Sequence, residues 1–112
     1  MLPQSRKIKG RKIFGTIYQS GQKTFSRFIS LFFAPINGPS KFACVVSLKV
    51  SKKAVLRNKL RRRAYSVIKE NSFNIKDGHA ASLVFKNGAT ELSYPQLSKY
   101  ILDLFKRAGL TI

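Results

Sequence analysis

The sequence predicts a single small domain of mixed α and β structure. Its 112 residues can enclose one modest core and leave no room for a second domain. Hydrophobic residues make up 44% of the chain and aromatic residues 12%, which is too apolar for a disordered protein. Segments with helical and strand periodicity alternate along it, in the expected order helix, strand, strand, helix, strand, helix.

The first half of the chain predicts a basic arm, a helix and two strand regions. Residues 1–12 are polar and basic, and we expect them to form a flexible extended arm. Apolar residues at helical spacing over 13–18 predict a helix that ends at a glycine. Residues 25–33 alternate like one strand, or like two strands separated by a bend. A turn rich in proline and glycine at 35–39 separates this region from a valine-rich strand at 42–48.

The second half predicts a helix, a strand and a further helix. Residues 54–70 carry apolar side chains in a helical stripe, and a loop follows over 71–78. An apolar run predicts a strand at 80–85. Ser93 and Gln96 have the spacing of a capping box, and apolar residues at helical spacing continue beyond them to the end of the last helix.

Positive charge dominates the composition. Twenty-two lysine and arginine residues face four acidic residues, which gives a formal net charge of +18. Because so many like charges repel one another in a compact fold, we expect a polyanionic partner. A surface that only confers solubility would mix both signs, and binding to a membrane surface would need a broad apolar face beside the basic one. Nucleic acid is therefore the leading candidate partner.

The apolar runs and the cysteine content indicate a soluble cytoplasmic protein. The longest uncharged apolar run, residues 28–36, is about half of the roughly 20 residues that a membrane span needs. No apolar stretch follows the basic N-terminus closely enough to form a signal peptide. Cys44 is the only cysteine, so no disulfide within the chain is possible, and a reducing cytoplasm is the expected compartment.

The reactive side chains argue against catalysis by the protein itself. The four carboxylates are scattered, without a pair close in sequence that could bind metal or divide the roles of acid and base. One histidine, His79, and one cysteine, Cys44, cannot complete a tetrahedral zinc site. We expect His79 at a turn and Cys44 in a buried strand. Any chemistry would then belong to a molecule that the chain binds.

The segment 49–63 concentrates the positive charge, because eight of its fifteen residues are basic. At about 100° per residue, the apolar stripe of the helix faces one way and the basic side chains lie on its two flanks. One flank carries Arg57, Asn58, Arg61 and Arg62, and the other carries Lys59 and Arg63. The planar fork of arginine suits bidentate phosphate contacts. No acidic residue is interleaved, so contact with nucleic acid is favoured over a solvated face.

The run KVSKKAVLRNKLRRR at 49–63 resembles the signature of the bacterial ribonuclease P protein subunit. In that family Ser-Lys-Lys-Val, a short connector and Arg-Asn-x-x-Lys/Arg-Arg follow one another. The pattern Phe14-x-x-Ile-Tyr-x-x-Gly21 is similar to the family's first helix, and the resemblance extends over residues 6 to 110. This chain differs from the commoner pattern at Leu48 and Tyr65, and its connector before the Arg-Asn pair is one residue longer.

The resemblance implies an α/β (α+β) two-layer sandwich in the order α-β-β-(β)-α-β-α, with one central sheet. In that family the basic helix forms a left-handed crossover between the strands that correspond to 42–48 and 80–85. Right-handed crossovers are so much commoner that the residues alone would predict the opposite hand. The left-handed crossover is therefore an expectation from the resemblance alone.

The resemblance also implies a role in tRNA maturation. In the family, a large RNA removes the 5′ leader of precursor tRNA with Mg²⁺ held mainly by that RNA, and the protein binds both the ribonuclease P RNA and the leader. It implies no catalytic residue in the protein, no organic cofactor, no membrane and no obligate protein partner. The residues that match RNA-binding positions are Arg57, Asn58, Lys59, Arg61, Arg62, Lys52 and Lys49. The residues that match the leader-binding cleft are Phe14, Tyr18 and Phe32.

Alternatives to this interpretation remain open. A ribosomal or other structural RNA-binding protein would share the charge and the size but would take no part in processing. A protein-only nuclease is disfavoured, because the carboxylates are few and scattered. The three aromatic residues could be ordinary core side chains, which applies most to Phe14 and Phe32, because the hydroxyl of Tyr18 favours a half-exposed site.

Overall fold

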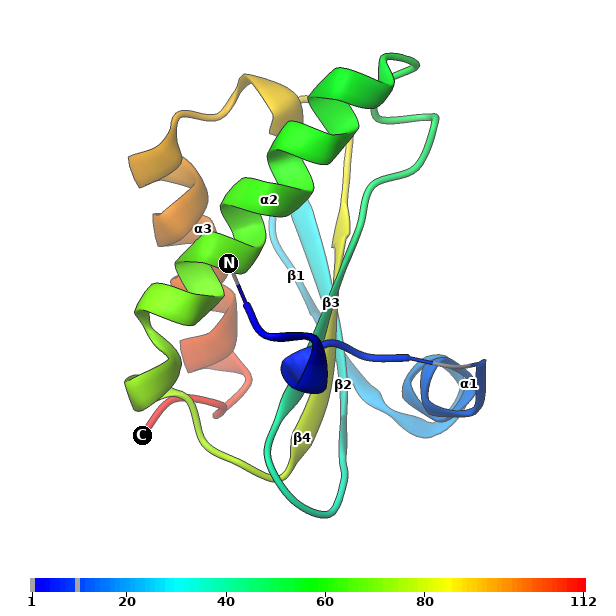
Figure 1. Cartoon of the computed structure of the whole chain (residues 1–112), viewed down its shortest axis with the longest axis vertical. Coiled ribbons are helices and arrows are strands. Elements are labelled where there is room, and N and C mark those ends of the chain that lie inside the picture. Colours follow the sequence, from blue (N-terminus) through cyan, green and yellow to red (C-terminus); the bar gives the residue numbers. More distant parts are fainter. Residues whose placement is uncertain (1, 10) are drawn as a thin grey trace.

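The computed structural model describes residues 2–9 and 11–112, which form a four-stranded sheet with helices packed against it (Figure 1). The strand order is β1-β2-β4-β3; β2 runs antiparallel to both of its neighbours, and β3 runs parallel to β4. The strands are β1 (Gln22–Phe25), β2 (Ile29–Pro35), β3 (Lys41–Val45) and β4 (His79–Phe85). The helices are α1 (Arg11–Ser20), α2 (Ala54–Glu70) and α3 (Tyr94–Arg107), with short 3₁₀ turns η1 (Gln4–Arg6), η2 (Ser72–Asn74) and η3 (Ala89–Glu91).

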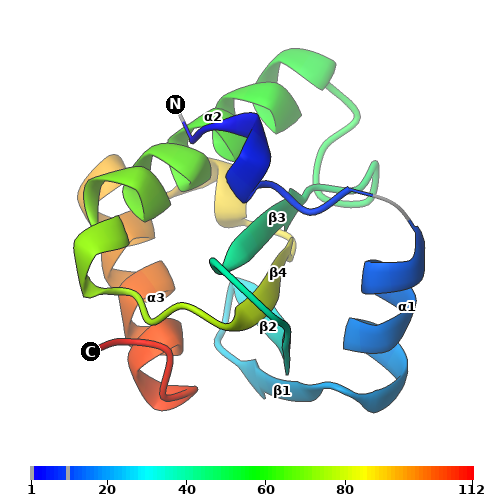
Figure 2. The same cartoon turned by 60° about the horizontal axis from the view of Figure 1, so that its bottom comes forward.

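Helices cover both faces of the sheet (Figures 1 and 2). On one face, α2 and α3 enclose the main core, in which Leu83 of β4 and Phe105 of α3 are fully buried. On the other face, Ile17 of α1 packs against the small side chains of Ala43 and Ala80. The expected mixed α+β fold is confirmed, and α1 adds a separate layer to the two-layer sandwich.

Helix α2 connects two parallel strands by a left-handed crossover. The chain leaves β3, enters α2, which packs on the sheet through its buried residues from Leu60 to Ile68, and returns to β4. Seen from the side of α2 with β3 running upward, β4 lies to the left of β3 (Figures 1 and 2). The hand expected from the family resemblance is therefore confirmed, against the general preference for right-handed crossovers.

The strand region expected at 25–33 contains only the last residue of β1, a bend and most of β2, so the start of β1 at Gln22 and the end of β2 at Pro35 lie outside the expected bounds. Ser26 makes this bend: its N–H donates to the Ile29 carbonyl at 2.8 Å, and its hydroxyl oxygen accepts from the Ile29 N–H at 3.2 Å. The strand expected at 42–48 ends earlier, at Val45. It ends there because a turn follows, in which the Val50 N–H donates to the Ser47 carbonyl at 3.1 Å.

The N-terminal segment differs from the extended arm expected at 1–12. Ile8 is buried, and its N–H donates to the Phe42 carbonyl at 2.9 Å. The guanidinium of Arg6 lies 3.8 Å from the carboxylate of Asp77. Residues 11 and 12 belong to α1 rather than to an arm. The described part of this segment therefore packs beside β3, while its flexibility stays a prediction.

Local signals at the helix ends lie where the sequence predicts them. Helix α2 spans the expected residues 54–70. The Gln96 N–H donates to the Ser93 hydroxyl oxygen at 3.3 Å, and the Ser93 N–H donates to the Gln96 side-chain carbonyl at 2.9 Å, which completes the capping box of α3. Gly109 follows α3 with a φ of +75°, in the left-handed region that glycine favours. Within the described residues, no helix combines the length and the apolar character that crossing a membrane requires.

Candidate nucleic-acid interface

One flank of α2 forms a basic surface together with the N-terminal segment. Five residues line a shallow hollow of about 280 Å³ there, and we call them the basic flank: Lys7, Asn58, Arg61, Arg62 and Tyr65. The Lys7 ammonium lies 4.5 Å from the centre of the Tyr65 ring, within the range of a cation–π contact. The Tyr65 hydroxyl accepts the Cys44 N–H at 3.2 Å, so the ring is anchored to β3 at its polar end.

No carboxylate neutralises the basic flank among the described residues. The two ion pairs in that part of the chain join Arg6 to Asp77 and Arg107 to Asp103, and neither involves α2. Arg61 donates to the side-chain carbonyl of Asn58, which is a neutral acceptor and leaves the guanidinium charge uncompensated. An arginine without a carboxylate partner presents N–H donors whose geometry matches phosphate oxygens.

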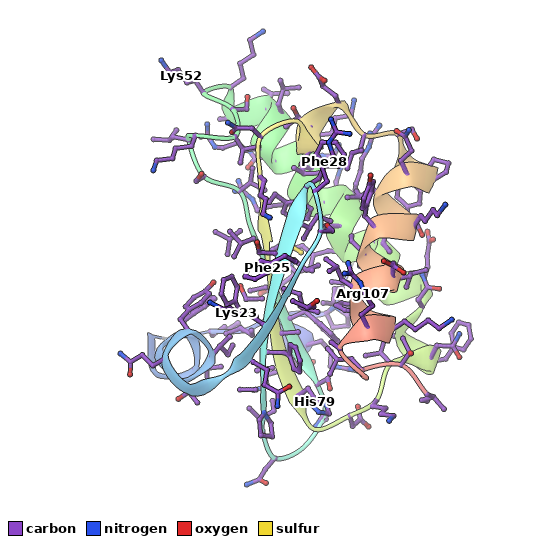
Figure 3. All side chains as sticks on the ribbon, turned by 180° about the vertical axis from the view of Figure 1, so that it is seen from behind. Lys23, Phe25, Phe28, Lys52, His79 and Arg107 are labelled. Atoms are coloured by element: carbon purple, nitrogen blue, oxygen red, sulfur yellow. The ribbon has the colours of Figure 1, made fainter. Side chains whose placement is uncertain are left out.

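Arg57 lies at the first turn of α2 and also holds the connector that precedes the helix. Its Nη1 donates to the Ser51 carbonyl at 2.9 Å. Arg57 therefore has a structural contact in addition to the RNA contact expected of it. Lys49 and Lys52 are exposed on the same connector, and Lys52 extends from one end of the molecule (Figure 3). Neither of these lysines lines the hollow of the basic flank.

Lys59 lies on the opposite flank of α2, as the helical spacing predicts. Together with Arg63 it lines a small hollow beside Thr90 of η3. The structure therefore brings Asn58, Arg61 and Arg62 together with Lys7 and separates Lys59 from them. One RNA surface that touched all the predicted residues would have to straddle α2.

The three aromatic residues expected in the leader-binding cleft form one cluster between α1 and the sheet, which we call the aromatic cluster: Phe14, Tyr18 and Phe32. The rings of Phe14 and Tyr18 are nearly parallel, 12° apart in plane, with centres 6.1 Å apart. Tyr18 meets Phe32 of β2 edge-on, with centres 5.0 Å apart. The hydroxyls of Tyr18 and the buried Ser82 of β4 share a hydrogen bond of 2.8 Å, which fixes Tyr18 across the sheet.

The aromatic cluster has both a core side and a surface side. Phe14 and Phe32 are half-buried and pack against the smaller core under α1, so the alternative of core packing holds for part of each ring. Tyr18 is 44% exposed and is the most accessible of the three. The structure thus brings the predicted residues together, while the path of a leader along them stays a prediction.

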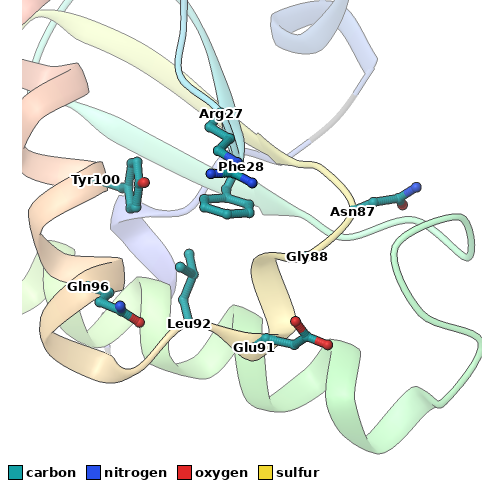
Figure 4. Close-up of a pocket in the computed structure, with 8 residues that line it drawn as sticks. All are labelled: Arg27, Phe28, Asn87, Gly88, Glu91, Leu92, Gln96 and Tyr100. Carbon is teal, nitrogen blue, oxygen red and sulfur yellow. The ribbon is translucent and has the colours of Figure 1, made fainter.

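A wider hollow of about 680 Å³ lies elsewhere, between the bend after β1 and the start of α3 (Figure 4). Within it, the Phe28 ring meets Tyr100 edge-on with centres 5.3 Å apart. Gly88 is required there, because its φ is +91° and a Cβ would come within 2.9 Å of the Phe28 ring. Arg27 and Glu91 both line the hollow, so their charges offset each other and give it no excess of positive charge for a polyanion. None of the predicted site residues lines it.

The sequence patterns do not identify Lys7 and Tyr65 as members of the basic flank. Tyr65 follows Arg61 and Arg62 at helical spacing, and this pattern could have placed it on the same flank. Burial raises the pKa of the Tyr65 hydroxyl, with the nearby Cys44 adding to the effect, so the group stays neutral. No local pattern places Lys7, because only its contact with the body of the fold brings it beside α2.

Comparisons with known proteins agree with one another. A sequence model described as Ribonuclease P matches residues 2–109. The ribonuclease P protein component of Microcystis aeruginosa is 33% identical, with 97% of this chain and 95% of that protein covered. That of Synechococcus sp. strain RCC307 is 34% identical, with 99% of this chain and 98% of that protein covered.

Among solved structures, the ribonuclease P protein of Staphylococcus aureus matches with a TM-score of 0.87 at 21% identity, covering 96% of this chain and 98% of that one. That of Thermotoga maritima matches with a TM-score of 0.82 at 23% identity, covering 90% and 96%. The likeness to these two structures shows the fold.

Proposed function

Because the chain belongs to the ribonuclease P protein family, we propose that it is the protein subunit of an RNA-based enzyme that removes the 5′ leader from precursor tRNA. In this proposal the protein binds the ribonuclease P RNA and the leader, and the phosphodiester is cleaved at the RNA. The protein contributes positioning of the substrate and neutralisation of phosphate charge.

The observation that carries the proposal is the uncompensated charge of the basic flank. Lys7, Arg61 and Arg62 gather on one surface, and no described carboxylate pairs with them. In a chain with a net charge of +18, such a surface attracts a polyanion and releases its counterions on binding. We assign this surface to the ribonuclease P RNA, with Arg57 extending it along the same helix, Lys49 and Lys52 as contacts on the connector, and Lys59 as a separate contact on the opposite flank of α2.

The aromatic cluster supports a contact with single-stranded RNA. Stacking on aromatic rings binds unpaired bases without regard to their sequence, which suits a leader that differs from one precursor to the next. Tyr18 is exposed enough to stack, and its bond to Ser82 holds the ring in place. We assign the aromatic cluster to the leader of precursor tRNA.

We assign the Mg²⁺ of the reaction mainly to the RNA partner. Among the described residues, no three histidine, cysteine or acidic side chains gather in a group that could hold a metal ion. The described side chains therefore offer no group of metal ligands, and we place both Mg²⁺ and the cleavage step at the RNA. A dense positive charge also disfavours the approach of free metal ions.

A processing assay tests the proposal. The chain is combined with a bacterial ribonuclease P RNA at a Mg²⁺ concentration at which that RNA alone cleaves precursor tRNA slowly. We expect faster cleavage with the chain present and a product that ends at the mature 5′ nucleotide. A structural RNA-binding protein would bind the RNA without raising the rate of leader removal. Binding without that acceleration would therefore overturn the proposed function.

A further inference from the structure

Phe25, at the end of strand β1, is an exposed aromatic side chain outside both the basic flank and the aromatic cluster. We propose that Phe25, flanked by Lys23 and Lys86, forms a second stacking site for single-stranded RNA and binds leader nucleotides farther from the cleavage site than those at the aromatic cluster. This inference rests on the proposed function, because it takes the leader as the ligand.

Two lysines surround the exposed ring of Phe25. The residue is 48% exposed although it lies in a strand. The Lys23 ammonium lies 5.6 Å from the ring centre and the Lys86 ammonium 5.3 Å from it. Lys86 also donates to the Ser26 carbonyl at 2.9 Å, so its ammonium is held beside the ring rather than moving freely in solvent. An exposed aromatic ring with two ammonium groups close to it matches a base that is linked to phosphates.

The site is positively charged, and core packing does not account for the ring. Neither of the two described ion pairs includes Lys23 or Lys86, so both ammonium charges remain available to phosphate oxygens. Phe25 belongs to neither of the two clusters of buried residues in the described part of the chain. An exposed phenylalanine on an edge strand favours unwanted pairing with other chains unless charge protects it or a ligand covers it. RNA fits both the ring and the two charges.

The strand register places Phe25 next to the aromatic cluster. Lys23 lies opposite Phe32 in the β1–β2 pair, and Phe25 lies opposite Ser30. Residues opposite each other in a ladder share one face, so Phe25 and Phe32 are diagonal neighbours on the face that carries α1. The Cα atoms of such diagonal neighbours are about 7–8 Å apart. Figure 3 shows Lys23 and Phe25 on the side of α1. The stacking surface therefore continues from Tyr18 and Phe32 to Phe25.

The strand order gives this surface a direction. The basic flank is anchored to β3 at one edge of the sheet, and Phe25 belongs to β1 at the other edge. The aromatic cluster reaches β2 and β4 between them. A leader that starts at the ribonuclease P RNA beside β3 meets the aromatic cluster first and Phe25 last. With strands about 4.8 Å apart, the two edges are about 15 Å apart, so Phe25 serves only leaders long enough to reach it.

Leader length is therefore the variable that tests the inference. Holoenzyme is assembled with wild-type chain or with Phe25→Ala, and its affinity is measured for precursor tRNAs whose leaders grow by single nucleotides. We expect Phe25→Ala to bind mature tRNA and short-leader precursors as the wild type does. Long-leader precursors should bind more weakly, by about 5-fold to 150-fold, which corresponds to the loss of one stacked base. Phe73→Ala is the matched control, because Phe73 is 73% exposed and lies in η2.

A tryptophan placed at the same position gives a second readout that does not depend on stability. The chain contains no tryptophan, so Phe25→Trp introduces a single indole fluorophore. Its emission should change when holoenzyme binds a long-leader precursor and stay constant with mature tRNA. The indole should also restore the affinity that alanine loses, because it stacks at least as well as phenylalanine.

The outcomes separate this inference from the proposed function. If Tyr18→Ala weakens precursors with a leader while Phe25→Ala has no effect at any leader length, the proposed function stands and the second stacking site is wrong. If Phe25→Ala weakens mature tRNA as strongly as long-leader precursors, Phe25 does not bind the leader. If neither variant depends on the leader at all, the leader assignment in the proposed function fails as well. Unchanged indole emission from the Phe25→Trp variant with every RNA would also overturn the inference.

Discussion

Tyr18 contributes to the core and to the surface with different parts of its side chain. Its hydroxyl bonds to the buried Ser82, while its ring stacks on Phe14 at the surface. Tyr18→Phe removes only the bond and leaves the Ser82 hydroxyl without it. We expect this variant to lose about 1–2 kcal/mol of unfolding free energy and to keep its preference for precursor over mature tRNA. We expect Tyr18→Ala to lose about 1–3 kcal/mol of that preference.

Urea unfolding of the free protein and equilibrium binding of the two RNAs to holoenzyme measure these effects separately. Phe32→Ala is a useful comparison, because the half-buried ring contributes to the smaller core and its loss should reduce stability as well as leader binding. Equal weakening of precursor and mature tRNA by Tyr18→Ala would contradict the assignment of its ring to the leader.

Because of Cys44, the free energy of unfolding should fall as the pH rises into the alkaline range. Burial raises the pKa of its thiol, because a thiolate inside the sheet would lose its hydration. The thiol of cysteine in an unfolded chain has a pKa of about 8.5. Above that pH the unfolded chain releases a proton that the folded chain keeps. The contribution of Cys44 is therefore full below about pH 8.5 and then falls by about 1.4 kcal/mol per pH unit.

Urea unfolding of the wild type and of Cys44→Ala from neutral to alkaline pH measures this contribution. The wild type should lose stability faster than the variant above the thiol pKa, and native protein should resist thiol reagents until it unfolds. Stability curves that stay parallel across the series would show that the thiol does not titrate differently in the two states.

Among the elements, α3 depends on its capping box for a defined start. Ser93→Ala removes the side-chain acceptor for the Gln96 N–H. We expect a loss of about 1 kcal/mol of unfolding free energy and no change in the affinity for RNA, since Ser93 lies outside the basic flank and the aromatic cluster. Thermal unfolding and holoenzyme binding test the two statements. A loss of RNA affinity at unchanged stability would place an RNA contact at the start of α3.

The basic flank of α2 predicts a salt-dependent contact. We expect replacement of Arg57, Arg61 and Arg62 by alanine to weaken holoenzyme assembly and to lower the log–log salt slope by about one unit for each lost phosphate contact. The matched control replaces the exposed Lys76, Lys99 and Lys106, which lie outside α2 and remove the same charge from other surfaces. If both triple variants change the slope equally, the contact is a property of the net charge and not of this flank.

The sequence predicts elements well where the signal is local and less well where a strand ends at a turn. The stripe of α2 and the capping box of α3 depend on residues within a few positions, and both are confirmed. The strand expected at 42–48 ends at Val45 because a turn follows it. The sequence leaves open whether the region 25–33 bends and does not place the bend, because serine is tolerated in a strand and only the bonds of Ser26 to Ile29 show that it makes a turn.

At the scale of the whole molecule, contacts between residues far apart in the sequence determine features that local sequence patterns do not predict. The hand of the crossover came from family resemblance, because the general preference for right-handed connections predicts the opposite. The docking of Lys7 beside Tyr65 depends on the N-terminal segment pairing with β3. The proximity of Phe25 to Phe32 depends on the register of β1 against β2. Periodicity along one segment contains none of this information.

The distribution of charge over the whole molecule predicts how catalysis depends on Mg²⁺. Two of the four acidic residues, Asp77 and Asp103, are paired with arginine. Glu70 ends α2 and Glu91 lies in η3, and no metal-binding group is found among the described residues. Two-metal hydrolysis needs ligands grouped around ions about 3.5–4 Å apart. We therefore expect the isolated protein to have no nuclease activity.

With its RNA, the protein should instead lower the Mg²⁺ concentration needed for cleavage. A net charge of +18 offsets the repulsion between two RNA molecules, which Mg²⁺ would otherwise have to screen. Cleavage of precursor tRNA by protein alone, RNA alone and both together, across a Mg²⁺ series, measures both statements. The half-maximal Mg²⁺ concentration should fall when protein is added, and less so with the Arg57, Arg61 and Arg62 variant. Leader removal by RNA-free protein that disappears in Glu70→Ala or Asp77→Ala would place the catalytic centre in the protein instead.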